Sequence, residues 1–214
     1  MGHPTRLLPH GERTVDVIAT TRATYDEIGH TYAEANRETP ESVSAAMDRF
    51  LAAIPASPVV ADVGCGPGRD LLELRASGVT AFGFDLSMGM LRAGGTTGLV
   101  QADMTLLPIK SASLDGVWCA AAFLHVPREL GLLALANFRR VLKPGGVLHL
   151  AVSEGEGQGF EPDAYGSSRE RWFVHYSSDE LIGMLKRLRM HVSSVARSEY
   201  RRTWLTIGAV RRPD

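Results

Sequence analysis

The chain has 214 residues, of which 44% are hydrophobic and 22% charged, and its formal net charge at pH 7 is −1. This composition is ordinary for a globular domain, and no apolar run reaches the roughly 18 residues that a membrane-spanning helix needs. The near-equal numbers of basic and acidic residues do not favour a protein that coats nucleic acid, and the two cysteines provide no disulfide framework. The first residues lack the apolar core of an export signal. We therefore expect one cytoplasmic domain with free thiols, a monomer or a homodimer, without a membrane segment.

Short apolar runs alternate with amphipathic segments along the chain. Helical periodicity covers residues 24–40, 41–54, 128–142 and 178–189. Strand character covers residues 59–63, 80–84, 98–102, 114–120, 146–152, 190–196 and 203–210. The segment KPGG at 143–146 predicts a break between a helix and the next strand. Strands separated by helices indicate right-handed βαβ units, hence a three-layer α/β sandwich with a mostly parallel sheet.

The C-terminal part departs from this alternation. Ser177 and Glu180 have the spacing of a capping box at the start of the last helix. The two strands that follow, 190–196 and 203–210, are separated only by a short polar link. Because such a link is too short for a crossover helix, the last strand is predicted to run antiparallel, as part of a hairpin.

A glycine-rich turn follows the first predicted strand. The segment GCGPG, residues 64–68, lies between a strand that contains Asp62 and a leucine-periodic helix. Glycines let the backbone approach a ligand closely, and free N–H groups at a helix start favour a polar or anionic group. Asp85 ends the next strand about 20 residues further on, where a carboxylate can accept ribose hydroxyls. Arg69 stands where a dinucleotide-binding loop has Gly or Ala, so the pattern favours a nucleoside ligand over NAD.

Four segments in order make the chain similar to a known family. They are VVADVGCGPGRDL at 59–71, GFDLSMGML at 83–91, QADMTLLPIKSASLDGVWCAAAFLHV at 101–126 and FRRVLKPGGVLHLAV at 138–152. Together they resemble the class I S-adenosylmethionine-dependent methyltransferases, of the small-molecule type that includes the ubiquinone and menaquinone biosynthesis methyltransferases. The resemblance implies a Rossmann-like, seven-stranded sheet with an antiparallel last strand, which agrees with the prediction from the tail.

The resemblance also implies a cofactor, S-adenosylmethionine, with S-adenosylhomocysteine as its product. No metal is required, and the histidines and cysteines show no ligand spacing. The resemblance implies that the methionine part of the cofactor contacts Asp62, Gly64, Cys65 and Gly66, and that Asp85 binds the ribose. It places the adenine between Leu86 and Met90 and against Asp103 and Met104. The sulfonium would lie near Ala120 and Ala121.

Several of these positions have a purely structural alternative. Asp62 and Asp85 could instead cap helices or turns, and Leu86 and Met90 could belong to the core. Both cysteines could be buried, inert thiols. His125, just past the fourth strand, is the candidate general base, although it could instead only position substrate or backbone by hydrogen bonding. Tyr25 and Tyr32, seven residues apart on one helical face, could contact the cofactor from a lid or pack in the core.

The segment 153–178 has the length and composition of a functional loop. It is rich in Gly and Ser, and we expect its Arg171, Trp172 and Tyr176 to contact the acceptor, unless the aromatic residues anchor the loop to the sheet. The single domain would then consist of a helical lid (1–54), a cofactor-binding core (55–152), this substrate loop and a C-terminal helix with a hairpin (179–214).

Three hypotheses of function follow from these features. The leading one is transfer of a methyl group to an O, N or C atom of a small molecule. The second is a tRNA methyltransferase of the wobble-uridine type, which would need a basic track, but residues 150–214 hold ten basic and nine acidic residues. The third is a non-catalytic nucleoside-binding or regulatory subunit. The scaffold does not identify the acceptor, because one fold hosts many functions.

Overall fold

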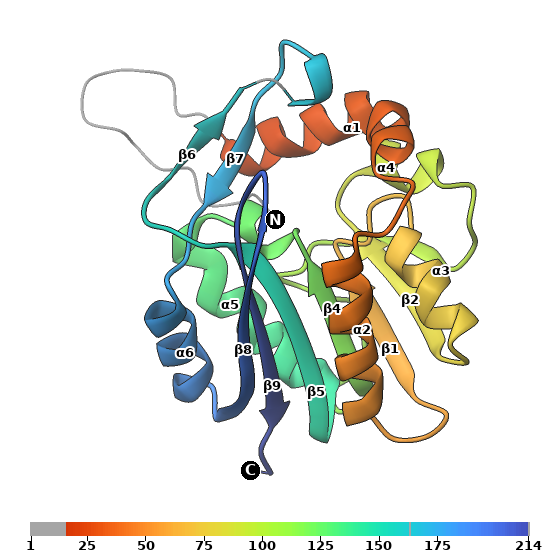
Figure 1. Cartoon of the computed structure of the whole chain (residues 1–214), viewed down its shortest axis with the longest axis vertical. Coiled ribbons are helices and arrows are strands. Elements are labelled where there is room, and N and C mark those ends of the chain that lie inside the picture. The colour runs from red at the N-terminus through yellow and green to blue at the C-terminus, as the bar shows by residue number, and fades with distance from the viewer. Residues whose placement is uncertain (1–15, 163, 214) are drawn as a thin grey trace.

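The computed structural model describes residues 16–162 and 164–213, and the first fifteen residues of the expected helical lid lie outside them. The described chain forms three layers, with a seven-stranded sheet between helices on both faces (Figure 1). This arrangement confirms the α/β sandwich predicted from the sequence. None of the helices in the described part of the chain is both long enough and apolar enough to cross a bilayer.

The elements follow the predicted order. The helices are α1 (Val17–Ala35), α2 (Glu41–Ala53), α3 (Arg69–Ala76), α4 (Met88–Ala93), α5 (Arg128–Val141) and α6 (Ser178–Arg187), with single 3-10 turns η1 (Phe123–His125) and η2 (Ala164–Gly166). The strands are β1 (Val59–Val63), β2 (Thr80–Asp85), β3 (Leu99–Gln101), β4 (Leu114–Ala120), β5 (Leu142–Ser153), β6 (Gln158–Glu161), β7 (Arg171–Val174), β8 (Met190–Tyr200) and β9 (Arg202–Arg211). The hydroxyl of Ser177 accepts the backbone N–H of Glu180 at 3.2 Å, so α6 begins at the predicted cap.

The sheet has the strand order β3-β2-β1-β4-β5-β9-β8. Strands β1 to β5 pair in parallel, whereas β9 runs antiparallel to both of its neighbours, as the tail of the sequence predicts. The chain moves outward from β1 to β3 and then returns to place β4 on the other side of β1. Ligands of open α/β sheets bind outside the carboxyl ends of the strands at such a reversal, so the topology itself indicates where to look for a site.

Alternate residues of the central strands face the two outer layers. Val60 and Trp118 pack with the α2 and α3 side chains on one face, whereas Ala61, Val117 and Cys119 pack with those of α5 and α6 on the other. Because strand side chains alternate and both faces are covered, the strands must be apolar almost throughout. This requirement explains why β1 and β4 are apolar over most of their length in the sequence.

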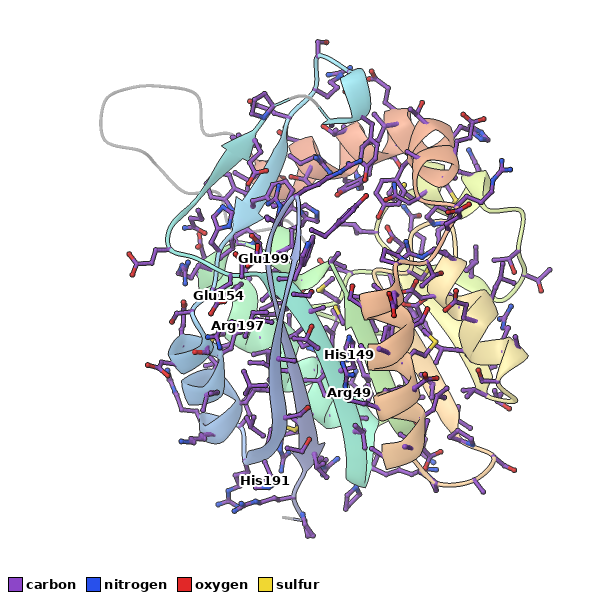
Figure 2. The ribbon with its side chains drawn as sticks, viewed as in Figure 1. Arg49, His149, Glu154, His191, Arg197 and Glu199 are labelled. Atoms are coloured by element: carbon purple, nitrogen blue, oxygen red, sulfur yellow. The ribbon has the colours of Figure 1, made fainter. Side chains whose placement is uncertain are left out.

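The β8–β9 hairpin is fastened to the end of β5 by an ion pair. Arg197 donates from Nε and Nη2 to the two carboxylate oxygens of Glu154, at 2.7 and 2.6 Å (Figure 2). Arg202 makes a second ion pair, to Glu161 of β6 at 2.8 Å. These ion pairs add to the antiparallel ladder that joins β9 to β5, and the bidentate Arg197 contact orients its side chain against the end of β5.

Two regions differ from the sequence prediction. Strand β5 begins at Leu142, directly after α5, so residues 143–146 extend the strand instead of separating it from the helix. Leu142 pairs with Leu114, and the β4–β5 ladder then shifts register before Gly116. This irregularity accommodates Gly145 and Gly146 within β5. The expected loop 153–178 contains a small antiparallel sheet of β6 and β7, which the sequence conceals because each strand has only four residues.

Burial of His149 makes stability depend on pH. Its ring stacks on Trp118 with 3.7 Å between centroids, and burial, then the nearby Arg49 of α2, lower its pKa to about 3 (Figure 2). Since the folded pKa lies below the unfolded value, the unfolded chain binds more protons between these values, and stability falls as pH drops below about 6.5.

We expect His149→Phe to reduce this acid sensitivity. The phenyl ring keeps the stacking contact and removes the titrating group. Urea unfolding at pH 7 and pH 5 should show that the wild type loses about 2 kcal/mol more stability than the variant over this interval. His191, which is exposed at the start of β8, provides the control, because His191→Phe removes an imidazole from the surface and not from the core. An equal loss in the wild type and His149→Phe would contradict the assignment.

Candidate functional site

A cavity of about 730 Å³ lies at the strand ends where the sheet order reverses. Its walls come from α1, the β1–α3 loop, the ends of β2 and β4, and the turn η1, and α1 crosses the top of the sheet above it (Figure 1). This volume is in the range of sites for small molecules and cofactors. The cavity is lined by the thirteen positions expected for a cofactor and by the candidate base, namely Tyr25, Tyr32, Asp62, Gly64, Cys65, Gly66, Asp85, Leu86, Met90, Asp103, Met104, Ala120, Ala121 and His125.

Two glycines of the β1–α3 loop have left-handed backbone conformations and close neighbours. Gly64 has φ of 74°, and a Cβ atom there would overlap the Cβ of Ala122 in the loop after β4. Gly66 has φ of 53°, and its Cβ would lie 2.9 Å from the Cε of Met90. The left-handed backbone and the close approach of two loops therefore account for both glycines.

Asp85 orients its carboxylate by two backbone hydrogen bonds. Its Oδ2 accepts the N–H of Gly66 at 2.9 Å and its Oδ1 accepts the N–H of Ser87 at 2.8 Å. Each carboxylate oxygen has a second lone pair, so the group can still accept two hydroxyls of a ligand. Burial raises the pKa of Asp85, and the N–H groups of Ser87 and Gly66 oppose that rise. Asp85 is therefore both a structural acceptor, as the capping alternative held, and a group on the cavity wall.

Asp62 is a buried carboxylate with an unused acceptor. Only 2% of the residue is exposed, and its Oδ2 has no hydrogen-bond partner in the described structure. Burial, then the charges of Asp70 and Asp85, raise its pKa well above the usual value. Arg69 lowers it, but Arg69 is itself paired with Asp70 at 2.8 Å. A hydrogen-bond donor with positive charge, bound in the cavity, would compensate this buried carboxylate.

Smaller and apolar groups complete the wall. Asp103 accepts the N–H and the hydroxyl of Thr105, each at 2.8 Å, which fixes its side chain beside the cavity. Ala121 is left-handed, with φ of 57°, and such strain in a non-glycine residue is typical of functional sites. Both cysteines are buried, and only Cys65 lines the cavity. Burial raises the pKa of the Cys65 thiol, which therefore stays protonated and is not activated as a nucleophile. The described residues include no cluster of side chains suited to a metal ion.

Tyr25 and His125 form a hydrogen-bonded pair at one side of the cavity. The Tyr25 hydroxyl lies 2.7 Å from Nε2 of His125, and Nδ1 of the same ring lies 2.6 Å from the carbonyl oxygen of Trp172. Arg171 donates from Nη1 to the Tyr25 oxygen at 3.2 Å. Burial lowers the pKa of His125 to about 3, and raises that of Tyr25 to about 12. At neutral pH the imidazole is therefore uncharged and the phenol keeps its proton.

Helix α1 is held over the cavity by contacts that the sequence did not reveal. Thr24 donates to the carbonyl of Glu170 at 2.7 Å, and Thr21 accepts the N–H of Trp172 at 2.9 Å. At its other side, Asp26 accepts the hydroxyl of Ser87 at 2.7 Å and the N–H of Gly89 at 2.8 Å. Thr21 and Thr24 lie on the buried face of α1 together with Ile28, whereas Asp26 is exposed. Hydrophobic periodicity assigns polar side chains to the exposed face, so it did not distinguish these threonines.

The three residues expected to contact the acceptor have different surroundings. Arg171 lies beside Tyr25, next to the cavity, whereas Trp172 contributes its backbone to the hydrogen bonds described above and packs its ring on Phe160. Tyr176 is fully buried against Phe123 and does not line the cavity. The aromatic residues thus anchor the segment, the alternative that the sequence left open, and Tyr176 has no access to a ligand in this cavity.

Comparison with known proteins identifies the core of the chain. Residues 61–150 match the family described as "Methyltransferase domain", from β1 through β5. Residues 61–150 thus have the sequence of a methyltransferase domain, which confirms the resemblance to methyltransferases. Within this methyltransferase domain lie the glycine loop, Asp85, Asp103 and the end of β4.

Curated relatives of the methyltransferase domain extend well beyond it. The malonyl-[acyl-carrier protein] O-methyltransferase of Laribacter hongkongensis is 33% identical over 151 residues, which are 61% of this chain and 49% of that protein. The protein of the same name from Enterobacter lignolyticus is 36% identical over 107 residues, 47% of this chain and 42% of that protein. The chain thus spans about half the length, or less, of these relatives.

A solved structure shares the fold over the whole chain. It is 1,6-didemethyltoxoflavin-N1-methyltransferase of Burkholderia thailandensis, with bound 1,6-didemethyltoxoflavin and S-adenosylhomocysteine. The TM-score is 0.74 at 19% identity, and the match covers 100% of this chain and 94% of that one. The fold of the methyltransferase domain therefore continues through α6 and the C-terminal hairpin.

We expect Gly64→Ala to lower the free energy of unfolding more than the same change at a left-handed glycine outside the cavity. Gly78 has φ of 83°, and no atom lies within 4 Å of the point that its Cβ would occupy, so Gly78→Ala should cost only the backbone strain, about 1 kcal/mol. Gly64→Ala adds the overlap with Ala122, and should cost roughly 1–3 kcal/mol more. Urea unfolding measures both changes. Equal losses in the two variants would show that the loops after β1 and β4 do not approach as described.

Proposed function

We propose that this chain transfers a methyl group from S-adenosylmethionine to an O, N or C atom of a small molecule. The observation that carries the proposal is a cavity with two carboxylates in different states. Asp85 is oriented by backbone N–H groups and retains lone pairs, whereas Asp62 is buried with an unpartnered oxygen. S-adenosylmethionine carries a ribose diol and a positively charged amino group, which match these two acceptors.

The other residues of the wall fit the remaining parts of that molecule. Leu86 and Met90 provide an apolar surface for a base, and Asp103, held by Thr105, provides an acceptor for an amino group. The excess of carboxylates around the cavity favours a ligand with positive charge. These features support cofactor binding by this chain, and they oppose the alternative of a subunit that has lost the cofactor.

S-adenosylmethionine supplies a methyl group that is already activated by a positively charged sulfur. The chain's own task is then to align the acceptor and to exclude water. Ala120 and Ala121 leave space at the end of β4, and α1 with its threonine contacts covers the same side of the cavity. We expect these residues to position the acceptor against the methyl group. When the acceptor carries a proton on its attacking atom, that proton must also be removed.

A small acceptor is favoured over RNA. The net charge is −1, and two of the basic residues near the C-terminus, Arg197 and Arg202, are already paired with glutamates, which disfavours their use in phosphate contacts. Of the relatives named above, the methyltransferase with bound 1,6-didemethyltoxoflavin supports an acceptor of low molecular weight. The malonyl-[acyl-carrier protein] O-methyltransferase is named for an acyl group carried on a protein, and neither name refers to a nucleic acid.

Calorimetric titration with S-adenosylhomocysteine tests the cofactor site. We expect Asp85→Asn to weaken binding roughly 10- to 100-fold, because hydrogen bonds to a charged acceptor contribute about 1.5–3 kcal/mol. Asp115→Asn is the matched control, since Asp115 lies at the start of β4, paired with Lys143 at 2.8 Å and away from the cavity. Wild-type protein without measurable binding would support the non-catalytic alternative, and equal affinity in Asp85→Asn would contradict the role of this carboxylate.

Release of S-adenosylhomocysteine, measured over a metabolite panel and total tRNA, tests the reaction. We expect turnover with one or more small molecules and none above background with tRNA. Loss of that turnover in Asp85→Asn at limiting cofactor, with recovery at high cofactor, would tie the activity to this site. Salt-sensitive turnover of tRNA alone would overturn the small-molecule proposal in favour of the RNA alternative.

A further inference from the structure

The hydrogen bonds through His125 have a fixed direction. Nδ1 of the ring faces the carbonyl oxygen of Trp172 at 2.6 Å, and a carbonyl oxygen can only accept, so Nδ1 carries the proton. The buried imidazole is uncharged, which leaves a lone pair on Nε2. The Tyr25 hydroxyl, 2.7 Å away, must therefore be the donor in that contact. One backbone carbonyl thus determines the tautomer of His125 and the direction in which Tyr25 donates.

The Tyr25 oxygen consequently faces other partners only as an acceptor. Its single proton is used by His125, and Arg171 donates to one of its lone pairs at 3.2 Å. A second lone pair remains, and Tyr25 lines the cavity. A ligand group that meets this oxygen can form a hydrogen bond only by donating one.

Arg171 gives this arrangement a positive charge at one end. Its guanidinium lies over the rings of Tyr25 and Phe173, at 5.6 and 5.1 Å from their centroids, and its Nε is buried without a hydrogen-bond partner among the described residues. No carboxylate is paired with it in the described ion pairs. The charge therefore favours negative charge that develops on the Tyr25 oxygen or on a group bound to it.

We propose that Tyr25 accepts the proton of the methyl acceptor and passes its own proton to His125, so that the acceptor is a hydroxyl or amino group that carries a proton on its attacking atom. This proposal rests on the proposed function and refines it, since it names the class of acceptor and gives Tyr25 a catalytic role toward the acceptor. Arg171 and the Trp172 carbonyl are positioning groups in this scheme.

The step balances in protons and charge. The acceptor's O–H or N–H bond breaks as its proton moves to the Tyr25 oxygen, and the former Tyr25 proton moves to Nε2 of His125. The acceptor's electron pair forms the bond to the methyl carbon, the carbon–sulfur bond breaks, and its electron pair stays on sulfur in S-adenosylhomocysteine. The total charge in the cavity is unchanged, because the positive charge lost from sulfur is replaced by one on the imidazole. Burial and the charges of Arg171 and Arg202 disfavour a charged His125, so the proton has to reach Nε2 together with the loss of the positive charge from sulfur.

The direction of the hydrogen bonds can be measured without any acceptor. Nitrogen-15 NMR of histidine-labelled protein, saturated with S-adenosylhomocysteine at pH 7.5, distinguishes the two imidazole tautomers, and His125→Asn identifies the resonances among the seven histidines. We expect His125 to carry its proton on Nδ1, and Tyr25→Phe to shift the Nε2 resonance. A proton on Nε2, or no response to Tyr25→Phe, would overturn the proposal whether or not the chain has methyltransferase activity.

Tyr165→Phe is the matched control for that variant. Tyr165 lies in the same group of aromatic rings, but its hydroxyl accepts from Asn36 at 3.0 Å and makes no contact with His125. We expect Tyr165→Phe to leave the Nε2 resonance and the affinity for S-adenosylhomocysteine unchanged. If both variants shift the resonance alike, the Tyr25 contact is not specific and the proposal fails.

Turnover of the acceptors found in the metabolite panel supplies the second readout. We expect Tyr25→Phe to lower kcat by about 10²–10⁴-fold, the usual contribution of acid–base catalysis, with the KM for S-adenosylmethionine within a few-fold of wild type. Unchanged kcat, or turnover confined to acceptors without a proton on the attacking atom, would refute the relay and leave the proposed function intact. Loss of cofactor binding in the wild type would instead refute the proposed function.

Discussion

The hydrogen bond from the Gly66 N–H to the Asp85 carboxylate joins the two loops on which the site depends. It connects the turn after β1 to the end of β2, and it forms only because Gly66 takes a left-handed backbone conformation. The same turn brings Gly64 against the loop after β4. Three strand ends thus meet closely at this junction, where a Cβ at Gly64 would overlap Ala122 and one at Gly66 would displace the end of the Met90 side chain.

The electrostatics of the cavity follow from that junction. Packing the loops closely brings Asp62, Asp70 and Asp85 near one another and removes them from water, with Arg69 as a cation already paired with Asp70. Buried carboxylates without a paired cation lower the stability of the folded chain, and groups of this kind are common at binding sites. The side of the cavity at Tyr25 has the reverse character, because Arg171 lies among aromatic rings and is paired with no carboxylate in the described part of the chain. A cationic cofactor and a proton-donating acceptor would therefore meet complementary surroundings.

Features of the site that depend on local sequence could be predicted, and features that depend on long-range packing could not. A strand, a glycine turn and a carboxylate at the end of the next strand are encoded within a few tens of residues, so Asp62, Gly64 and Asp85 were identified directly. The Tyr25 contact joins residues 100 positions apart, and its partner on β7 belongs to a small sheet that the sequence conceals. Tyr176 was expected to contact the acceptor but is buried in the core. The sequence of segment 153–178 does not indicate whether an aromatic residue faces a ligand or the core.

The buried indole of Trp118 connects the cavity wall to the interior of the protein. Its N–H donates to Asp70 at 2.9 Å, and Asp70 lies on the cavity wall, paired with Arg69. Because Trp118 is fully shielded from water, its emission depends on the local electric field rather than on solvent. A change of charge in the cavity alters that field through one carboxylate. Of the three tryptophans in the chain, Trp118 is thus an intrinsic fluorophore that a single carboxylate connects to the cavity wall.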